Sequence, residues 1–154
     1  MSELKHSLNF KFEWRSYQQN FLDNFEEHIT DNHLHVVAPP GSGKTILGLE
    51  ILRRVNKRTL ILAPTLTIRN QWCDRLESFF LIEDSLVDYT TDIKKPKYLT
   101  FSTYQSLHAL NKRLLGDTSD SLLKFIKRYG IQTVVLDEAH HLKNEWYKCL
   151  MVLK

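Results

Sequence analysis

Short apolar runs alternate along this chain with stretches in which apolar residues recur at helical spacing. The runs are as long as typical strands, and they lie at 33–38, 59–62 and 131–136. Helical spacing is found over 45–55 and from Ile68 to Phe79. A further strand and helix are expected within 97–110. This alternation of strands and helices predicts an α/β domain with a mostly parallel central sheet.

Other segments carry weaker patterns. An amphipathic helix is expected near the N-terminus, with a buried face formed by Tyr17, Phe21, Phe25 and Ile29. Gly130 ends another helical stretch, because glycine readily adopts the conformation that closes a helix. The segments 83–96 and 111–120 are polar and rich in turn residues, so we expect loops there.

A glycine-rich segment from Ala38 to Thr45, with the sequence APPGSGKT, joins the first expected strand to the next helix. Gly41 and Gly43 permit backbone conformations closed to other residues, so that N–H groups can turn toward an anion. Lys44 would reach the β- and γ-phosphates of a nucleoside triphosphate, and the Thr45 hydroxyl would bind Mg²⁺. The expected phosphate-binding residues are Pro40, Gly41, Ser42, Gly43, Lys44 and Thr45. Ala38 stands where the pattern has glycine, and this position need only be small.

Two adjacent carboxylates follow the last expected strand. Asp137 and Glu138 come directly after 131–136, and ligands of open α/β sheets bind at the carboxyl ends of the strands. Asp137 is placed to hold Mg²⁺ and Glu138 to orient the attacking water. Lys44, Asp137 and Glu138 are therefore the expected catalytic residues. An acidic pair at this position also suits the positive end of a helix dipole, which is a purely structural alternative.

These motifs together resemble the first RecA-like domain of a superfamily 2 helicase or translocase of the DEAD/DEAH-box type. Arg15-Ser16-Tyr17-Gln18 is similar to the adenine-reading motif of that superfamily, so Arg15 and Gln18 are expected to contact the nucleotide. The segment DEAHHLKN, which begins at Asp137, is similar to the translocating ATPases of restriction enzymes and chromatin remodellers. The resemblance implies a three-layer RecA-like P-loop NTPase fold, ATP and Mg²⁺ as ligands, and a coupling role for His140.

Two further motifs resemble the nucleic-acid contacts of the superfamily. Ala63-Pro64-Thr65 follows the strand at 59–62, and a second segment, TFSTY, places hydroxyl groups near the end of another strand. The resemblance implies that a nucleic-acid backbone is contacted by Pro64, Thr65, Arg69 and Thr103. Thr65 can also cap the helix that follows it, and the two functions are compatible. We expect DNA in preference to RNA, although no motif in the sequence distinguishes them.

Other classes of protein stay open at this point. A hexameric AAA+ ATPase often shares the PPGSGKT segment, but its interval between lysine and acidic pair is usually shorter, and it would lack the motif at 15–18. A non-catalytic nucleotide-binding or scaffold module would carry the same residues without turnover. A small-molecule phosphoryl transferase would need an arginine-rich lid, and no segment resembles one.

The composition and net charge limit the classes of protein and of metal site that the chain can represent. With 154 residues, 42% of them hydrophobic, the chain has the content of one globular domain. Its net charge of +3 predicts weak nucleic-acid binding by this domain alone. Cys73 and Cys149 are too few and too separated for a disulfide framework or a zinc site, and the histidines lack ligand spacing. We expect a cytoplasmic setting and a monomeric isolated domain.

The resemblance also implies parts that the 154 residues do not include. Residues 1–154 correspond to an incomplete first RecA-like domain, truncated at its C-terminus. The second RecA-like domain, which supplies arginine to the ATP site in the superfamily, is absent from the sequence. We therefore expect this chain to be the ATP-binding half of a larger motor, and to hydrolyse ATP slowly by itself.

Overall fold

The computed structural model of the chain describes residues 8–24, 43–81, 87–115 and 121–137. These residues form two compact units. The helical unit takes its residues from 1–56 and 75–87, and the sheet unit from 57–74 and 88–154. Among the helices of the described ranges, none has the length and apolar character needed to cross a lipid bilayer.

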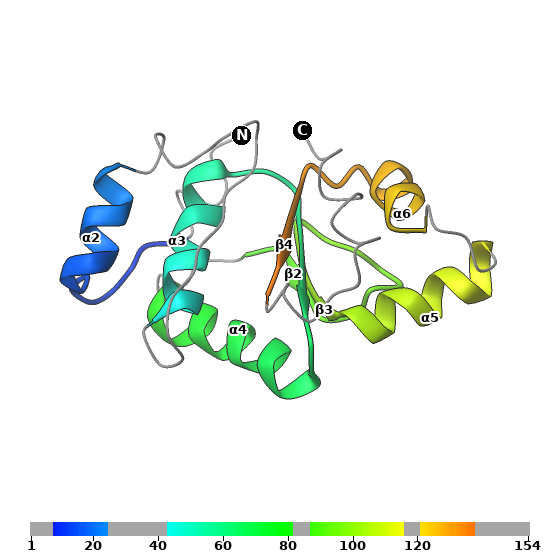
Figure 1. Cartoon of the computed structure of the whole chain (residues 1–154), viewed down its shortest axis with the longest axis horizontal. Coiled ribbons are helices and arrows are strands. Elements are labelled where there is room, and N and C mark those ends of the chain that lie inside the picture. The colour runs from blue at the N-terminus through cyan, green and yellow to red at the C-terminus, as the bar shows by residue number, and fades with distance from the viewer. Residues whose placement is uncertain (1–7, 25–42, 82–86, 116–120, 138–154) are drawn as a thin grey trace. The chain divides into compact units, whose positions relative to one another are not determined.

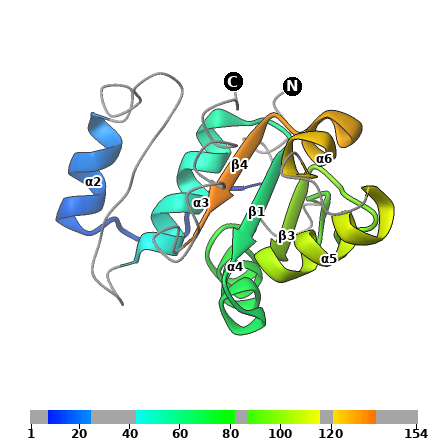
Figure 2. The same cartoon turned by 45° about the vertical axis from the view of Figure 1, so that its right-hand side comes forward.

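A parallel four-stranded sheet forms the centre of the sheet unit (Figure 2). Its strands are β1 (Thr59–Ala63), β2 (Tyr89–Thr90), β3 (Leu99–Thr103) and β4 (Thr133–Leu136), in the order β2-β3-β1-β4. All neighbouring pairs run parallel. Every residue of β1 and β3 is buried, as expected of parallel strands that are covered on both faces. The predicted α/β class with a parallel sheet is confirmed.

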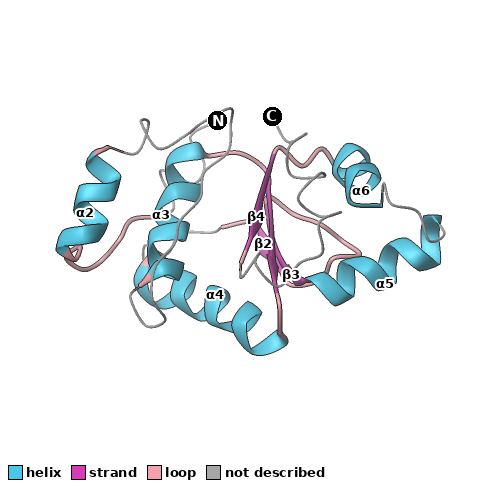
Figure 3. Ribbon diagram, in the orientation of Figure 1, coloured by secondary structure: helices cyan, strands magenta, loops and turns pink. Residues whose placement is uncertain are grey.

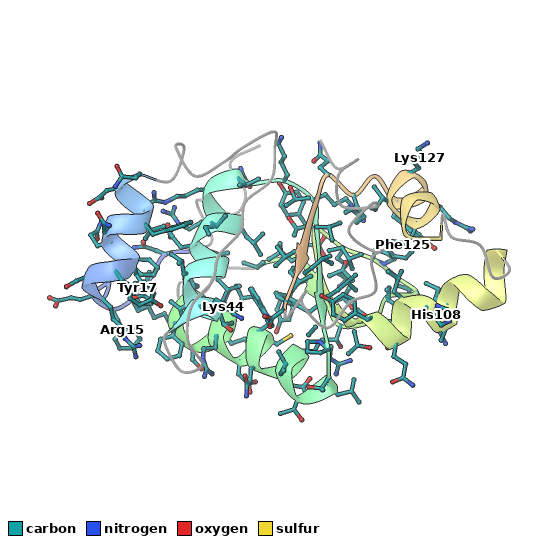
Figure 4. The ribbon with its side chains drawn as sticks, in the orientation of Figure 1. Arg15, Tyr17, Lys44, His108, Phe125 and Lys127 are labelled. Carbon is teal, nitrogen blue, oxygen red and sulfur yellow. The ribbon has the colours of Figure 1, made fainter. Side chains whose placement is uncertain are left out.

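Helices cover both faces of this sheet. On one face lie α5 (Tyr104–Leu115) and α6 (Ser121–Tyr129) (Figure 1). Their core with the strands contains Leu60, Leu62, Leu107, Leu110, Phe125 and Ile126. Phe125 is buried there, whereas Lys127 is exposed and points away from it (Figure 4). The first part of α4 (Leu66–Phe79) lies on the other face, where the ring centroids of Trp72 and Phe101 are 6.5 Å apart.

The end of α6 at Gly130 positions the chain to enter β4. Gly130 follows α6 with a φ of 67°, and the Ile131 N–H donates to the Ile126 carbonyl at 3.0 Å, which closes the helix. The N–H groups of Gln132 and Thr133 then donate to the Arg58 carbonyl at 2.8 and 3.1 Å. The expected helix end at Gly130 is confirmed, and the chain enters β4 directly after it.

The helical unit contains α2 (Ser16–Asp23) and α3 (Lys44–Val55). Leu8 pairs with Leu81 in an isolated antiparallel bridge, and the Asn9 N–H donates to the Phe80 carbonyl at 2.8 Å. Phe10 stacks on Trp14 with a centroid distance of 3.9 Å and also contacts Phe80. These contacts anchor the segment that leads into α2.

Three expectations about the elements need correction. β2 lies inside the segment 83–96, which we expected to be a loop, and α5 continues to Leu115, inside the expected loop 111–120. Tyr17 was expected on the buried face of the first helix, but it is 40% exposed, and Gln18 and Leu22 are the buried residues of α2. The expected strand at 33–38 lies outside the described residues.

Candidate active site

The first turn of α3 has the backbone that the phosphate-loop pattern requires. Gly43 precedes the helix with a φ of 88°, in the left-handed region that favours glycine. Lys44 and Thr45 are the first two residues of the helix, and both are half-buried. The special conformation expected of Gly43 is confirmed. Pro40, Gly41 and Ser42 lie outside the described residues, and their role stays a prediction.

Gln18 joins the start of α2 to the start of α3. Its Oε1 accepts a hydrogen bond from the Arg15 N–H at 2.9 Å, and its Nε2 donates to the Gly43 carbonyl at 3.1 Å. Arg15, Tyr17 and Lys44 lie at this same end of the two helices (Figure 4). An amide group has two donors and two acceptor sites, so Gln18 retains one of each, the number that one edge of adenine requires. Gln18 is only 3% exposed, and its two hydrogen bonds hold the amide in this orientation.

A buried ionic cluster joins the two helices farther along. Glu50 is 2% exposed and accepts hydrogen bonds from Arg53 Nε at 2.8 Å and Arg54 Nε at 3.1 Å. Arg54 also donates to the Leu22 carbonyl of α2 at 3.1 Å. This cluster was not among the residues expected from the sequence, although arginines three and four residues after a glutamate are a recognisable pairing pattern in helices. It fixes α2 against α3, and therefore Gln18 against Gly43.

Asp137 directly follows β4 and is held by three hydrogen bonds within the sheet unit. Its N–H donates to the Leu62 carbonyl at 2.9 Å, which continues the pairing of β4 with β1. Its Oδ2 accepts a hydrogen bond from Trp72 Nε1 at 2.9 Å, and its carbonyl accepts one from the Tyr104 hydroxyl at 2.8 Å. Asp137 is 6% exposed. The contacts of Trp72 and Tyr104 join residues 65 and 33 positions apart, so no local sequence signal identifies them.

The expected nucleic-acid residues lie at the carboxyl edge of the same sheet. Ala63 and Thr103 are register partners in neighbouring strands, so the chain leaves β1 toward α4 and β3 toward α5 at this same edge (Figure 3). The Thr65 hydroxyl accepts the Ile68 N–H at 3.2 Å, which confirms that it caps α4. Arg69, one turn into α4, donates to the exposed Asn70 Oδ1 at 2.9 Å. Pro64 is half-buried before the cap.

Thr103 is more enclosed than expected of a surface contact. It is 4% exposed, and its hydroxyl accepts the Ser106 N–H at 3.1 Å and donates to Ser106 Oγ at 2.9 Å. It therefore caps α5, and its contact with nucleic acid stays a prediction. Glu138 and His140 lie outside the described residues, so their roles stay predictions too.

The donor chemistry at these positions suits Mg²⁺. The Asp137 carboxylate and the Thr45 hydroxyl offer oxygen ligands, which hard divalent cations prefer. Within the described ranges, no three residues among histidine, cysteine, aspartate and glutamate gather into a metal cluster. Such a small protein contribution is usual for Mg²⁺, which is commonly held by one or two side chains together with substrate phosphates. Lys44 and Thr45 belong to the helical unit and Asp137 to the sheet unit, so their action on one nucleotide stays a prediction.

Residues 11–154 match the protein family described as type III restriction enzyme, res subunit. The chain belongs to this family. The match extends from before the motif at 15–18 to the last residue, so it includes every expected site residue. This membership confirms the resemblance to superfamily 2 motors and the RecA-like fold class.

Relatives of this res-subunit domain carry names of nucleic-acid motors. The Rad25 protein of Halobacterium salinarum, named for a DNA 3'-5' helicase, is 29% identical over 140 residues, or 90% of this chain. The DNA 3'-5' translocase XPB2 of Sulfurisphaera tokodaii is 27% identical over 143 residues, or 93% of this chain. QP509L of African swine fever virus, named for an ATP-dependent RNA helicase, is 28% identical over 136 residues, or 86%. The chain spans 21%, 28% and 25% of these three relatives.

Proposed function

We propose that this chain is the ATP-binding part of a nucleic-acid-dependent ATPase motor that couples ATP hydrolysis to movement along DNA. The observation that carries the proposal is the start of α3, where a left-handed Gly43 is followed by Lys44 and Thr45 and is held by the buried Gln18 amide. A helix start of this kind is a binding site for phosphate. The amide beside it has the hydrogen-bonding capacity to select adenine.

Each residue has a distinct role in the proposed mechanism. Lys44 binds the β- and γ-phosphates, and Thr45 and Asp137 hold the metal ion. When bound, Mg²⁺ neutralises charge on the phosphate oxygens. Glu138 orients the water that attacks the γ-phosphate. The ammonium group of Lys44 offsets negative charge that spreads over the transferred group. Arg15 and Gln18 read the base, and His140 couples the site to neighbouring motifs.

The nucleic-acid partner is proposed from the carboxyl edge of the sheet. Thr65 and Thr103 start two neighbouring helices there, and Arg69 adds a cation one turn into α4. Phosphate contacts of this kind position a protein on nucleic acid without reading its sequence. DNA is proposed over RNA because Rad25 and XPB2 carry DNA in their names. RNA is the alternative because QP509L is named for an RNA helicase.

The test is ATP hydrolysis by the full-length protein with duplex DNA, single-stranded DNA or RNA added. We expect DNA to stimulate turnover, and Glu138→Gln to lower it by about 100-fold or more while ATP binding is kept, because the water loses its base. Glu13→Gln, at an exposed position before α2, is the matched control. A scaffold module would bind ATP equally as wild type, Glu138→Gln and Glu13→Gln, and DNA would not stimulate its ATP hydrolysis. That result would reject the proposed motor.

A further inference from the structure

Asp137 is held by side chains of two different helices. Trp72 of α4 donates its indole N–H to Oδ2, and both residues are buried, at 3% and 6% exposure. Tyr104, the first residue of α5, donates its hydroxyl to the carbonyl of Asp137. One contact fixes the carboxylate and the other fixes the main chain. All three residues belong to the sheet unit.

Both donors lie close to the predicted nucleic-acid contacts. Trp72 is two helical turns beyond Thr65, the cap of α4, and Tyr104 directly follows Thr103, the cap of α5. A helix transmits a shift along its length because hydrogen bonds link its successive turns. A displacement at the start of either helix therefore reaches a group that is bonded to Asp137.

We propose that Trp72 and Tyr104 are positioning residues for the metal-binding Asp137, and that they transmit to it the binding of nucleic acid at the starts of α4 and α5. The inference rests on the proposed function, since it requires Asp137 to bind Mg²⁺ and both helix starts to face nucleic acid. Coupling between two sites can be carried by rigid elements and the hydrogen bonds that join them. α4 with Trp72 and α5 with Tyr104 form such connections to Asp137.

The chemistry of the Trp72 contact supports a functional role. A buried indole N–H needs a hydrogen-bond acceptor, and a main-chain carbonyl would satisfy that need. Here the acceptor is a carboxylate at the carboxyl end of a parallel strand, where ligands of such sheets bind. Ligating carboxylates are themselves hydrogen-bonded in metal sites, and loss of that partner typically lowers metal affinity 10- to 100-fold.

Two substitutions separate the hydrogen bond of Trp72 from its packing. Trp72→Phe keeps an aromatic ring against Phe101 but lacks the donor. Trp72→His is smaller, but its imidazole Nε2 occupies the place of the indole Nε1 and can donate. The readout is binding of Mn²⁺, as a spectroscopic probe for Mg²⁺, by the full-length protein with a non-hydrolysable ATP analogue. We expect Trp72→Phe to weaken Mn²⁺ binding about 10-fold or more, and Trp72→His to restore most of it.

The reverse order of the two variants would overturn the role of Trp72. If Trp72→His binds Mn²⁺ poorly while Trp72→Phe matches the wild type, the side chain acts through its bulk. Thermal melting of each variant gives the packing effect separately, and we expect Trp72→His to be the less stable of the two because it fills less volume.

Tyr104→Phe tests transmission. This variant keeps the ring and removes the hydroxyl bond to the Asp137 carbonyl, and we expect stimulation of hydrolysis by DNA to fall about fivefold or more, the lower range of allosteric coupling. Tyr129→Phe is the matched control, because the Tyr129 ring packs on Phe125 with a centroid distance of 4.8 Å and its hydroxyl bonds to none of the described residues. Equal stimulation in both variants would overturn transmission through Tyr104.

Asp137→Ala distinguishes failure of the inference from failure of the proposed function. If Asp137→Ala and the wild type bind Mn²⁺ and nucleotide equally, Asp137 is no metal ligand and the proposed site is wrong. If Asp137→Ala abolishes Mn²⁺ binding while both Trp72 variants match the wild type, the site stands and only the positioning role is rejected.

Discussion

Helices α3, α4 and α5 begin in two different ways. α4 and α5 each follow a threonine whose hydroxyl accepts an N–H of the first turn, from Ile68 and Ser106. α3 follows Gly43, which has no side chain to offer. Every helix start has N–H groups without partners in the helix. In α4 and α5 a threonine hydroxyl accepts one of these N–H groups, whereas Gly43 offers α3 no such side-chain acceptor. The missing side-chain cap therefore marks the helix start that is suited to an anion.

Among the described residues, two glycines have a positive φ, Gly43 and Gly130, and their surroundings differ. A Cβ added to Gly43 would lie 2.5 Å from Gln18 Nε2, whereas one added to Gly130 would meet nothing within 4 Å. Gly130 is required only for its conformation, which ends α6. Gly43 is required for its conformation and for the space that the Gln18 amide occupies. The proposed phosphate-binding start of α3 is thus more constrained than the end of α6.

The largest expected effect comes from Lys44→Ala. This substitution tests whether the start of α3, unlike those of the capped helices α4 and α5, is the phosphate site. We expect ATP hydrolysis to fall about 100-fold or more, since removing one preformed charge-stabilising group commonly costs that much. Lys57→Ala is the control, because Lys57 is exposed and follows the end of α3. Steady-state ATPase assays measure both variants. Unchanged hydrolysis by Lys44→Ala would show that the start of α3 is not the phosphate site.

Gly43→Ala and Gly130→Ala test whether the two glycines differ in the space that they leave for neighbouring side chains. Each substitution places a Cβ in the left-handed region, at a cost of about 1–2 kcal/mol in the free energy of unfolding. Gly43→Ala must in addition displace the Gln18 amide, so we expect it to be the more destabilising and the only one to weaken ATP binding. Urea unfolding and nucleotide titration measure these effects. Equal losses in both variants would mean that the Gln18 contact adds no constraint.

The smallest effect concerns the capped helices. Thr65→Ala and Thr103→Ala each remove a cap, and we expect each to lower the free energy of unfolding by about 1 kcal/mol. Thr103→Ala should be the larger loss, because Thr103 is buried and also bonds to Ser106 Oγ. The midpoint of urea unfolding, with Thr67→Ala as a control inside α4, measures the difference. A variant with unchanged stability would show that its threonine is no effective cap.

Much of the fold could be predicted because its signals are local. β1 and β4 are short apolar runs, α3 has helical spacing, and Gly130 closes α6 as expected. The two-residue β2 was not predicted, since Tyr89 and Thr90 form a strand only by pairing with β3. The helical spacing also placed Tyr17 inside, but Gln18 takes the buried position because its amide bonds to Arg15 and Gly43.

The candidate site, like the fold, could be predicted only where its signals are local in the sequence. The motifs at 15–18, 43–45 and 137 were recognisable because the chemistry needs those residue types at those positions. The side chains that support them were not, because Trp72 and Asp137 lie far apart in sequence and meet only through packing on the sheet. Even Arg54, whose pairing with the buried Glu50 is local, joins α2 through a bond to the Leu22 carbonyl that no spacing rule specifies.

The bond between Trp72 and Asp137 also gives the protein an optical probe of its own. Indole fluorescence responds to charge close to the ring nitrogen, and here that nitrogen lies 2.9 Å from a carboxylate oxygen. The chain has two other tryptophans, Trp14 and Trp146, and replacing them with phenylalanine would leave emission from Trp72 alone. Arrival of a cation beside this carboxylate could then be followed in real time without a label.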